Sequence, residues 1–194
     1  NWHGVFKNKK KNGELFWESA VISPVKDREG TITHFLGVKE DITEQILAEE
    51  VLKKNIKELK DYKYALDESS ILAITNEKGE LLSVNDNFCK ISKYNREELI
   101  GKTHRILNSG FHNIAFFKEL WGIISSGKVW RGEIKNKTKD GQYYWVDTTI
   151  IPFLDAHKKP FQYLAIRFDI TEKKIAEESV QHTLNEKNNI LESI

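Results

Sequence analysis

Asn136 is the residue whose position most clearly indicates a specific hydrogen-bonding role. From Trp130 to Asn136 the chain alternates, and Trp130, Gly132, Ile134 and Asn136 fall on one side of a strand while charged residues fall on the other. An amide is thereby placed on the apolar side, where burial without a partner costs about 1–3 kcal/mol. We therefore expect Asn136 to bond to backbone, to water or to a ligand.

Three other side chains could carry chemistry. His112 precedes a long apolar-striped segment and raises the question of a haem ligand, although helix capping or exposure is the commoner environment for such a histidine. Cys89 suits a small buried residue, and His104 lies in a predicted loop over 102–112. The sequence has no glycine-rich phosphate loop, no metal-spaced Cys/His cluster and no nucleophile near a base. We do not expect an enzyme active site in these residues.

The elements that position these residues follow from periodicity and turn signals. We expect strands over 69–75, 80–84, 129–137, 143–154 and 161–169, with short helices begun by Asn85 and Asn95 and a longer helix over 113–126. In the last strand Leu164, Ile166 and Phe168 face one way and Arg167 faces the other. This order predicts an α+β fold, with a five-stranded antiparallel sheet, short helices on one face and a cavity between them.

The sequence also repeats itself. Residues 1–46 align without a gap on residues 129–174, so that Trp2 matches Trp130, Asn8 matches Asn136 and the tryptophan, glycine and proline positions keep their register. Such matches indicate a module repeated in tandem. We expect residues 1–42 to be the last three strands of a first copy, residues 68–170 to be a complete second copy, and the chain to be a fragment of a longer protein.

Two polar segments without proline or glycine flank the second copy. Residues 43–67 should form a linker helix capped by Thr43, with an apolar seam at Leu52, Ile56, Leu59 and Leu66, and residues 171–194 should form an exit helix. The seam suits either a coiled coil or a helix packed on its own sheet. The exit helix has a more irregular apolar pattern, at Ile175, Val180, Leu184 and Leu191.

The composition limits which partners and which cellular location we expect for the protein. The formal net charge of the 194 residues is +1, which gives no electrostatic reason to expect nucleic-acid binding. The lone Cys89 rules out an internal disulfide, and no apolar run approaches the roughly 18–20 residues of a membrane span. We expect a cytoplasmic location and no membrane contact within this fragment.

These features together resemble the Per-Arnt-Sim (PAS) family of sensory domains. The resemblance covers residues 67–171 fully and residues 1–44 as a half copy, and it lies in the following landmarks: Asn85–Phe88, Tyr94–Gly101, Trp130 with Gly132, Lys139–Gly141 and Asp169–Thr171. It implies a sensory and signal-relay module of a bacterial signal-transduction protein, namely a sensor histidine kinase. It also implies a homodimer joined through the flanking helices and a downstream kinase or other output domain in the same chain.

A narrower resemblance links the second copy to the FAD-binding PAS domains of aerotaxis receptors and nitrogen-fixation redox sensors. It rests on four segments: Gly101–Asn108, Phe117–Trp121, Gly127–Gly132 and Lys135–Trp145. In that group the residues matching Trp121 and Asn136 lie at the isoalloxazine ring. An amide offers a donor and an acceptor to the flavin, and an indole provides an apolar wall. The resemblance implies that Trp121, Asn136, His104, Asn108 and Trp130 contact FAD.

The sequence departs from its relatives in one loop. His104 stands where the photoactive light-oxygen-voltage branch carries its adduct-forming cysteine, so an adduct photocycle is not expected. Asn108-Ser109 stands where the aerotaxis receptors have an Arg-His pair. Two hypotheses follow: a sensor of redox state or oxygen through FAD, or a cofactor-free spacer that dimerises and relays signals. An open cavity walled by Trp121 and Asn136 favours the sensor, and one filled by Phe116, Phe117 and Ile134 favours the spacer.

Overall fold

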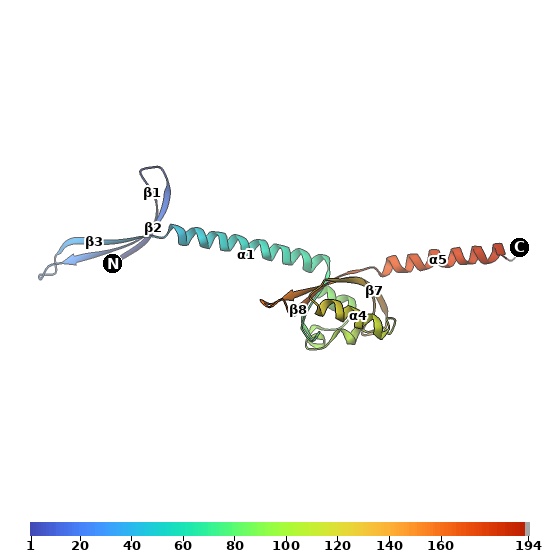
Figure 1. The fold of residues 1–194 in the computed structure, drawn as a ribbon. Helices are drawn as coiled ribbons and strands as arrows, with labels where there is room; N and C mark the ends of the chain where they lie inside the picture. Colours follow the sequence, from blue (N-terminus) through green and yellow to red (C-terminus); the bar gives the residue numbers. More distant parts are fainter. Residues whose placement is uncertain (193–194) are drawn as a thin grey trace. The chain divides into compact units, whose positions relative to one another are not determined.

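The computed structural model describes residues 1–192; the last two residues predicted for the exit helix, 193–194, lie outside the described part. The chain divides into two compact units, residues 1–62 and 63–194. Each unit has a sheet of its own (Figure 1).

The first unit contains the three strands predicted for residues 1–42. Strands β1 (Trp2–Lys9), β2 (Leu15–Lys26) and β3 (Ile32–Asp41) form an antiparallel sheet in the order β1-β2-β3. Its pairing matches that of the second sheet at the predicted shift of 128 residues, since Trp2 pairs with Ile22 as Trp130 pairs with Ile150. That the two sheets are tandem copies of one module stays a prediction.

Two long helices carry the chain into and out of the second unit. Helix α1 (Thr43–Ser69) has no buried residue, and helix α5 spans Thr171–Glu192. The predicted seam residues of α1 are exposed in the single chain, from 41% at Leu66 to 67% at Leu59. Of the apolar residues predicted for the exit helix, Leu191 lies outside the residues whose side chains are described.

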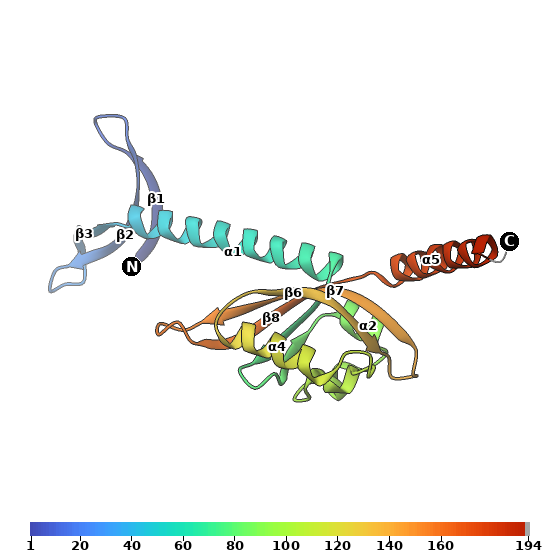
Figure 2. The same ribbon diagram turned by 45° about the vertical axis from the view of Figure 1, so that its right-hand side comes forward.

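The second unit has the predicted five-stranded antiparallel sheet. Its order is β5 (Leu81–Val84), β4 (Ile71–Asn76), β8 (Pro160–Asp169), β7 (Tyr143–Leu154) and β6 (Trp130–Lys137). The short helices are α2 (Asp86–Ser92), α3 (Arg96–Leu99), the 3-10 helix η1 (His104–Leu107) and α4 (Ile114–Ser125). Figure 2 shows α2 and α4 on the same face of this sheet. The predicted α+β fold class is therefore confirmed.

The core lies between the sheet and these helices. Phe88, Leu81, Leu99, Leu107 and Val146 have relative exposures of 2% or less. Burial of such side chains stabilises a fold by about 1.5–3 kcal/mol each. Helices α2, α3 and η1 each contribute one of these buried side chains, and α4 contributes Leu120 and Ile124.

Asn85, the predicted cap of α2, joins the first elements of the second unit through hydrogen bonds. Its side-chain oxygen accepts the N–H groups of Leu72 and Phe88, both at 3.0 Å. Its amide nitrogen donates to the carbonyl groups of Asp67 (3.0 Å) and Ser70 (2.7 Å). One buried side chain thus joins the end of α1, strand β4 and helix α2.

None of the helices within residues 1–192 combines the length and apolar character that a membrane crossing requires.

Candidate functional site

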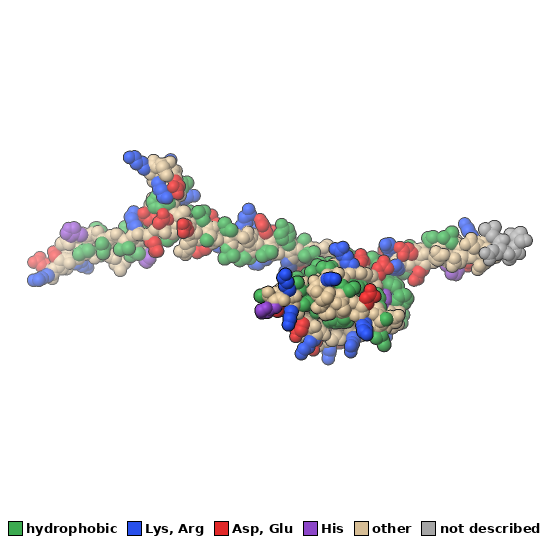
Figure 3. Space-filling view, in the orientation of Figure 1, with side chains coloured by type: hydrophobic (Ala, Val, Ile, Leu, Met, Phe, Trp, Pro, Cys, Tyr) green, Lys and Arg blue, Asp and Glu red, His purple; other side chains and the backbone are tan. Residues whose placement is uncertain are grey.

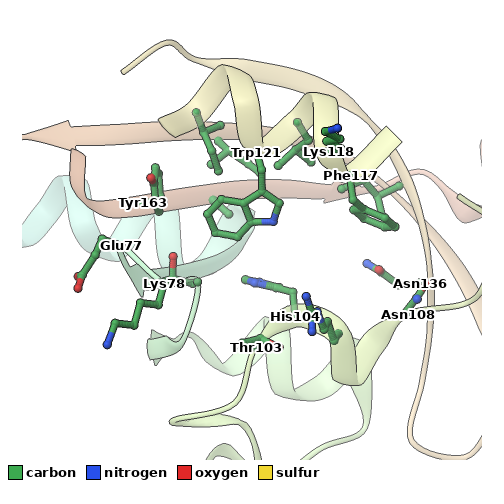
Figure 4. A pocket seen from close by; sticks show the side chains of 18 of the residues that line it. Glu77, Lys78, Thr103, His104, Asn108, Phe117, Lys118, Trp121, Asn136 and Tyr163 are labelled. Carbon is green, nitrogen blue, oxygen red and sulfur yellow. The ribbon is translucent and has the colours of Figure 1, made fainter. Parts of the chain in front are cut away.

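A cavity of about 1040 Å³ lies between the sheet and helix α4. It is bordered by the β4–β5 turn, by η1 and the loop after it, and by strands β6, β7 and β8. Figure 4 shows Trp121 and Phe117 of α4 pointing into this space opposite His104, Asn108 and Asn136. Four of the five predicted site residues, Trp121, Asn136, His104 and Asn108, line the same cavity.

Trp130 lies elsewhere. It is 8% exposed, its indole covers Gly132, and its ring meets that of Phe116 edge to face at 5.7 Å. A methyl group on Gly132 would come within 2.7 Å of this indole, so the glycine makes room for it. Trp130 is a core residue of strand β6 and is not among the residues that line the cavity, so its predicted contact with FAD stays a prediction.

Asn136 is presented to the cavity by an edge strand that a loop closes. Strand β6 is the last strand of the sheet, and the backbone of Asn108 bridges to that of Asn136 along its free edge. The Ser109 hydroxyl donates to the Lys135 carbonyl, and the Lys135 N–H donates to Nε2 of His112 at 3.0 Å. The loop satisfies backbone groups that an exposed edge would leave unpaired, and it holds Asn108 beside Asn136.

His112 therefore has a structural task, different from the capping or exposed role expected. Its Nε2 accepts a backbone hydrogen bond, and its ring stacks on Phe116 at 4.1 Å. Burial lowers the pKa of His112, which favours the neutral ring that this acceptor role requires. A nitrogen engaged in this way is not free to bind a haem iron.

Trp121 forms the wall at the opposite end of the cavity. It is 39% exposed, and its ring meets Tyr163 edge to face at 5.7 Å. Gly79 lies beneath it in the β4–β5 turn with φ of +82°, and a Cβ there would approach the indole to 2.8 Å. The turn thus fixes the position of Trp121 through a glycine that both the backbone and the contact require.

His104 and Arg167 meet on the floor of the cavity. Nη2 of Arg167 lies 2.8 Å from Nε2 of His104. Because a guanidinium can only donate, His104 must accept through Nε2 and is neutral. Burial, and then the charge of Arg167, hold the pKa of His104 well below its usual range. Burial also lowers the pKa of Arg167 to about 10, so this residue remains a cation at neutral pH.

Tyr144 pairs across the strands with Asn136 and is 6% exposed. Burial raises the pKa of Tyr144 to about 12, against the charge of Arg167 and the amide of Asn136, which lower it. The phenol stays protonated at neutral pH and keeps a donor beside Asn136.

Sequence reasoning missed Arg167 as a residue of the site. The alternation in β8 is confirmed, but the side covered by the helices is the one with Tyr163 (5% exposed), Ala165 (4%) and Arg167 (5%). Phe168, on the other side, is 50% exposed. Since both sides of the strand carry apolar residues, the pattern alone did not say which one is buried. An arginine in register with the buried side is the signal that could have identified it.

The far face of the same strands holds the start of α5. Thr171 accepts the N–H of Trp145 at 3.0 Å, and Asp169 accepts the N–H of Thr171 at 2.9 Å. Lys174 pairs with Glu133 of β6 at 2.5 Å and lies 5.3 Å from the centre of the Trp145 ring. Strand β6 thus carries the cavity residue Asn136 on one face and Glu133, which anchors α5, on the other.

Across residues 1–192, His, Cys, Asp and Glu side chains form no group of three or more that could hold a metal ion.

The model of the PAS domain family matches residues 1–44 and 67–172. The chain belongs to this family of sensory domains. It is 29% identical over 110 residues to the aerotaxis receptor of Escherichia coli, a match that covers 57% of this chain and 22% of the receptor. It is 28% identical over 119 residues to a nitrogen fixation regulatory protein of Klebsiella oxytoca, which covers 61% of this chain and 22% of that protein.

A solved structure of an RNA-binding light-oxygen-voltage receptor has the same fold. It superposes with a TM-score of 0.56 at 16% identity and covers 88% of this chain and 44% of the receptor. These matches show a PAS sensory module of the type present in signalling proteins. This chain spans about a fifth of the length of the two curated relatives.

Proposed function

We propose that the second unit is a sensor of redox state or oxygen that binds FAD in the cavity beside α4. The observation that carries this proposal is the open cavity itself. Its volume of about 1040 Å³ is at the upper end of the roughly 300–1,000 Å³ common for small-molecule sites. Phe117 and Ile134 line this space without filling it, and Phe116 stacks on His112 instead.

The cavity's lining suits a flat, heteroaromatic ligand. Trp121 and Phe117 offer apolar ring surfaces, and Asn136 and Asn108 offer amide donors and acceptors opposite them (Figure 4). Bound FAD would supply reversible two-electron chemistry, while these side chains would hold it and exclude water. The relatives include an aerotaxis receptor and a nitrogen fixation regulatory protein, the two groups whose FAD-binding PAS domains the sequence resembles, and this supports the proposal.

The test is FAD binding to the full chain and to Asn136→Ala. Losing an amide that would make two hydrogen bonds to the ring, at about 0.5–1.5 kcal/mol each, should weaken FAD binding by roughly 5- to 150-fold. The matched control is Asn8→Ala, the same change at the corresponding position of the first sheet, which should bind FAD like the wild type. Equal affinity of Asn136→Ala and wild type would refute the assignment of Asn136.

The route from the cavity to α5 is short. Arg167 lies in the cavity, and two positions further along β8 Asp169 accepts the N–H of Thr171 at the start of α5. On β6, Asn136 faces the cavity and Glu133 holds Lys174 of α5. A small shift of either strand would change these anchors. Coupling of about 1–3 kcal/mol between cavity and helix is enough for such a signal.

The second candidate function is a cofactor-free spacer that dimerises through its flanking helices. The observation that favours it is the exposed seam of α1, where Leu52 is 58% and Leu59 is 67% exposed. Figure 3 shows apolar side chains along this helix. Burying this seam against a second copy would stabilise a coiled-coil dimer. A dimer is expected for the FAD-binding sensor and for the cofactor-free spacer. Sedimentation therefore tests whether the chain dimerises, and FAD binding distinguishes the two functions.

Either function requires an output beyond these residues. We propose that α5 leads to an effector domain in the same chain, such as a sensor histidine kinase, and that the module has no catalytic activity of its own.

A further inference from the structure

Arg167 is a buried cation with an unused donor. Its side chain lines the cavity, the residue is 5% exposed, and Nη1 has no hydrogen-bond partner. Nη2 is engaged with His104. In the part of the chain that the structure describes, no carboxylate forms an ion pair with Arg167. A second buried group without a partner, the hydroxyl of Thr148, lies directly across the β7–β8 pair.

A buried cation and a buried hydroxyl without partners lower the stability of the folded protein unless a further group binds to them. An unpaired buried charge, or a buried donor without an acceptor, lowers the stability of a protein. The neutral His104 accepts one hydrogen bond but does not neutralise the guanidinium. Arg167 stands beside an open cavity despite this loss of stability, which indicates that its partner is a ligand in the cavity.

The first sheet shows how the same position is satisfied within the protein. At the shift of 128 residues Lys39 corresponds to Arg167, and Lys39 pairs with Glu18 at 2.5 Å. The residue corresponding to Glu18 is Val146, which is fully buried. The second sheet thus has a cation at the corresponding position, but an apolar side chain where the first sheet has the carboxylate.

We infer that Arg167 is the charge-recognition residue of the cavity and that it binds an anionic oxygen of the ligand. This rests on the proposed function in its choice of FAD as that ligand. Two-electron reduction of bound FAD by dithionite, with uptake of one proton from solvent, adds one negative charge to the flavin. A buried cation beside it stabilises that charge. Arg167 should therefore make the cavity bind reduced FAD more tightly than oxidised FAD.

The first measurement is the midpoint potential of FAD bound to wild type and to Arg167→Met, by dithionite titration. We expect the preference for reduced FAD to fall about tenfold in Arg167→Met, which lowers the potential by about 30 mV for a two-electron couple. Arg167→Lys keeps the charge and should restore part of the shift. Arg131→Met, which removes an exposed cation that does not line the cavity, is the control and should leave the potential unchanged. An unchanged potential in Arg167→Met would overturn the inference.

The second measurement does not need FAD. Replacing a buried cation that has no carboxylate partner by an apolar side chain removes the cost of its burial and keeps apolar contact with the ring of Phe88, over which the guanidinium lies. His104 faces the cavity, where water can replace the lost partner. Ligand-free Arg167→Met should thus unfold at the same urea concentration as wild type or a higher one. Unfolding at a lower concentration would make Arg167 a structural residue and overturn the inference. If wild type binds no FAD, the proposed function fails, and this measurement still decides the role of Arg167.

Discussion

Asn85→Ala should be among the most damaging single changes in the second unit, because one side chain serves four backbone groups. The Asn85 oxygen is the acceptor for Leu72 and Phe88, and its nitrogen is a donor to Asp67 and Ser70. The residue is 8% exposed, so water does not readily replace these bonds.

The loss of stability in Asn85→Ala depends on which of the four backbone groups keep another hydrogen-bond partner. The carbonyl groups of Asp67 and Ser70 also accept from Nδ2 of Asn87, at 2.9 and 3.2 Å. The N–H groups of Leu72 and Phe88 would lose their side-chain acceptor. At about 1–3 kcal/mol for each unsatisfied buried group, the free energy of unfolding should fall by roughly 2–6 kcal/mol.

The assay is urea unfolding of the full chain at neutral pH, followed by circular dichroism. The matched control is Asn87→Ala, two of whose three carbonyl acceptors are shared with Asn85 while the third, that of Glu68, is exposed, and a loss of about 1 kcal/mol or less is expected there. Asn85→Asp keeps an acceptor for both N–H groups but places a charge against two carbonyls, so it should fall between the two. If Asn85→Ala and Asn87→Ala were equally stable, the role given to Asn85 would be wrong.

Two further predictions concern the cavity. Because the native pKa of His104 is held down by burial and by Arg167, the unfolded chain takes up a proton first as the pH falls through about 6.5, and stability should decline by up to about 1.4 kcal/mol per pH unit. In urea unfolding at several pH values, His104→Gln should reduce this decline and the exposed control His157→Gln should not. Gly79→Ala should cost about 1–2 kcal/mol from its positive φ and should also displace Trp121 and change tryptophan fluorescence. Gly141→Ala, with φ of +91° and open space around it, should cost a similar amount without that fluorescence change.

The sequence was most informative where a local pattern dominates. The predicted strand over 129–137 is observed as β6 (Trp130–Lys137), and the predicted helix over 113–126 is observed as α4 (Ile114–Ser125). Period-2 alternation and an apolar stripe are properties of neighbouring residues, so they can be read without the fold. The side assigned to Asn136 followed from the same alternation.

The parts that the sequence did not predict depend on contacts between distant residues. His112 caps the edge of β6 from 23 positions away, and Arg167 meets His104 across 63 positions. No spacing rule connects such pairs. Trp130 shows that alternation alone does not identify a cavity residue. A tryptophan on the covered side of a strand can pack over a nearby glycine instead of lining the cavity.

The visible absorption spectrum of the purified full chain, before and after heat release, tests the central claim most directly. If the module binds FAD, flavin bands should appear in the spectrum of the protein and of the supernatant after heating, and the ligand-free chain should take up FAD again when it is added. A colourless protein that fails to take up added FAD would contradict the account and leave the dimerising spacer as the function of this module.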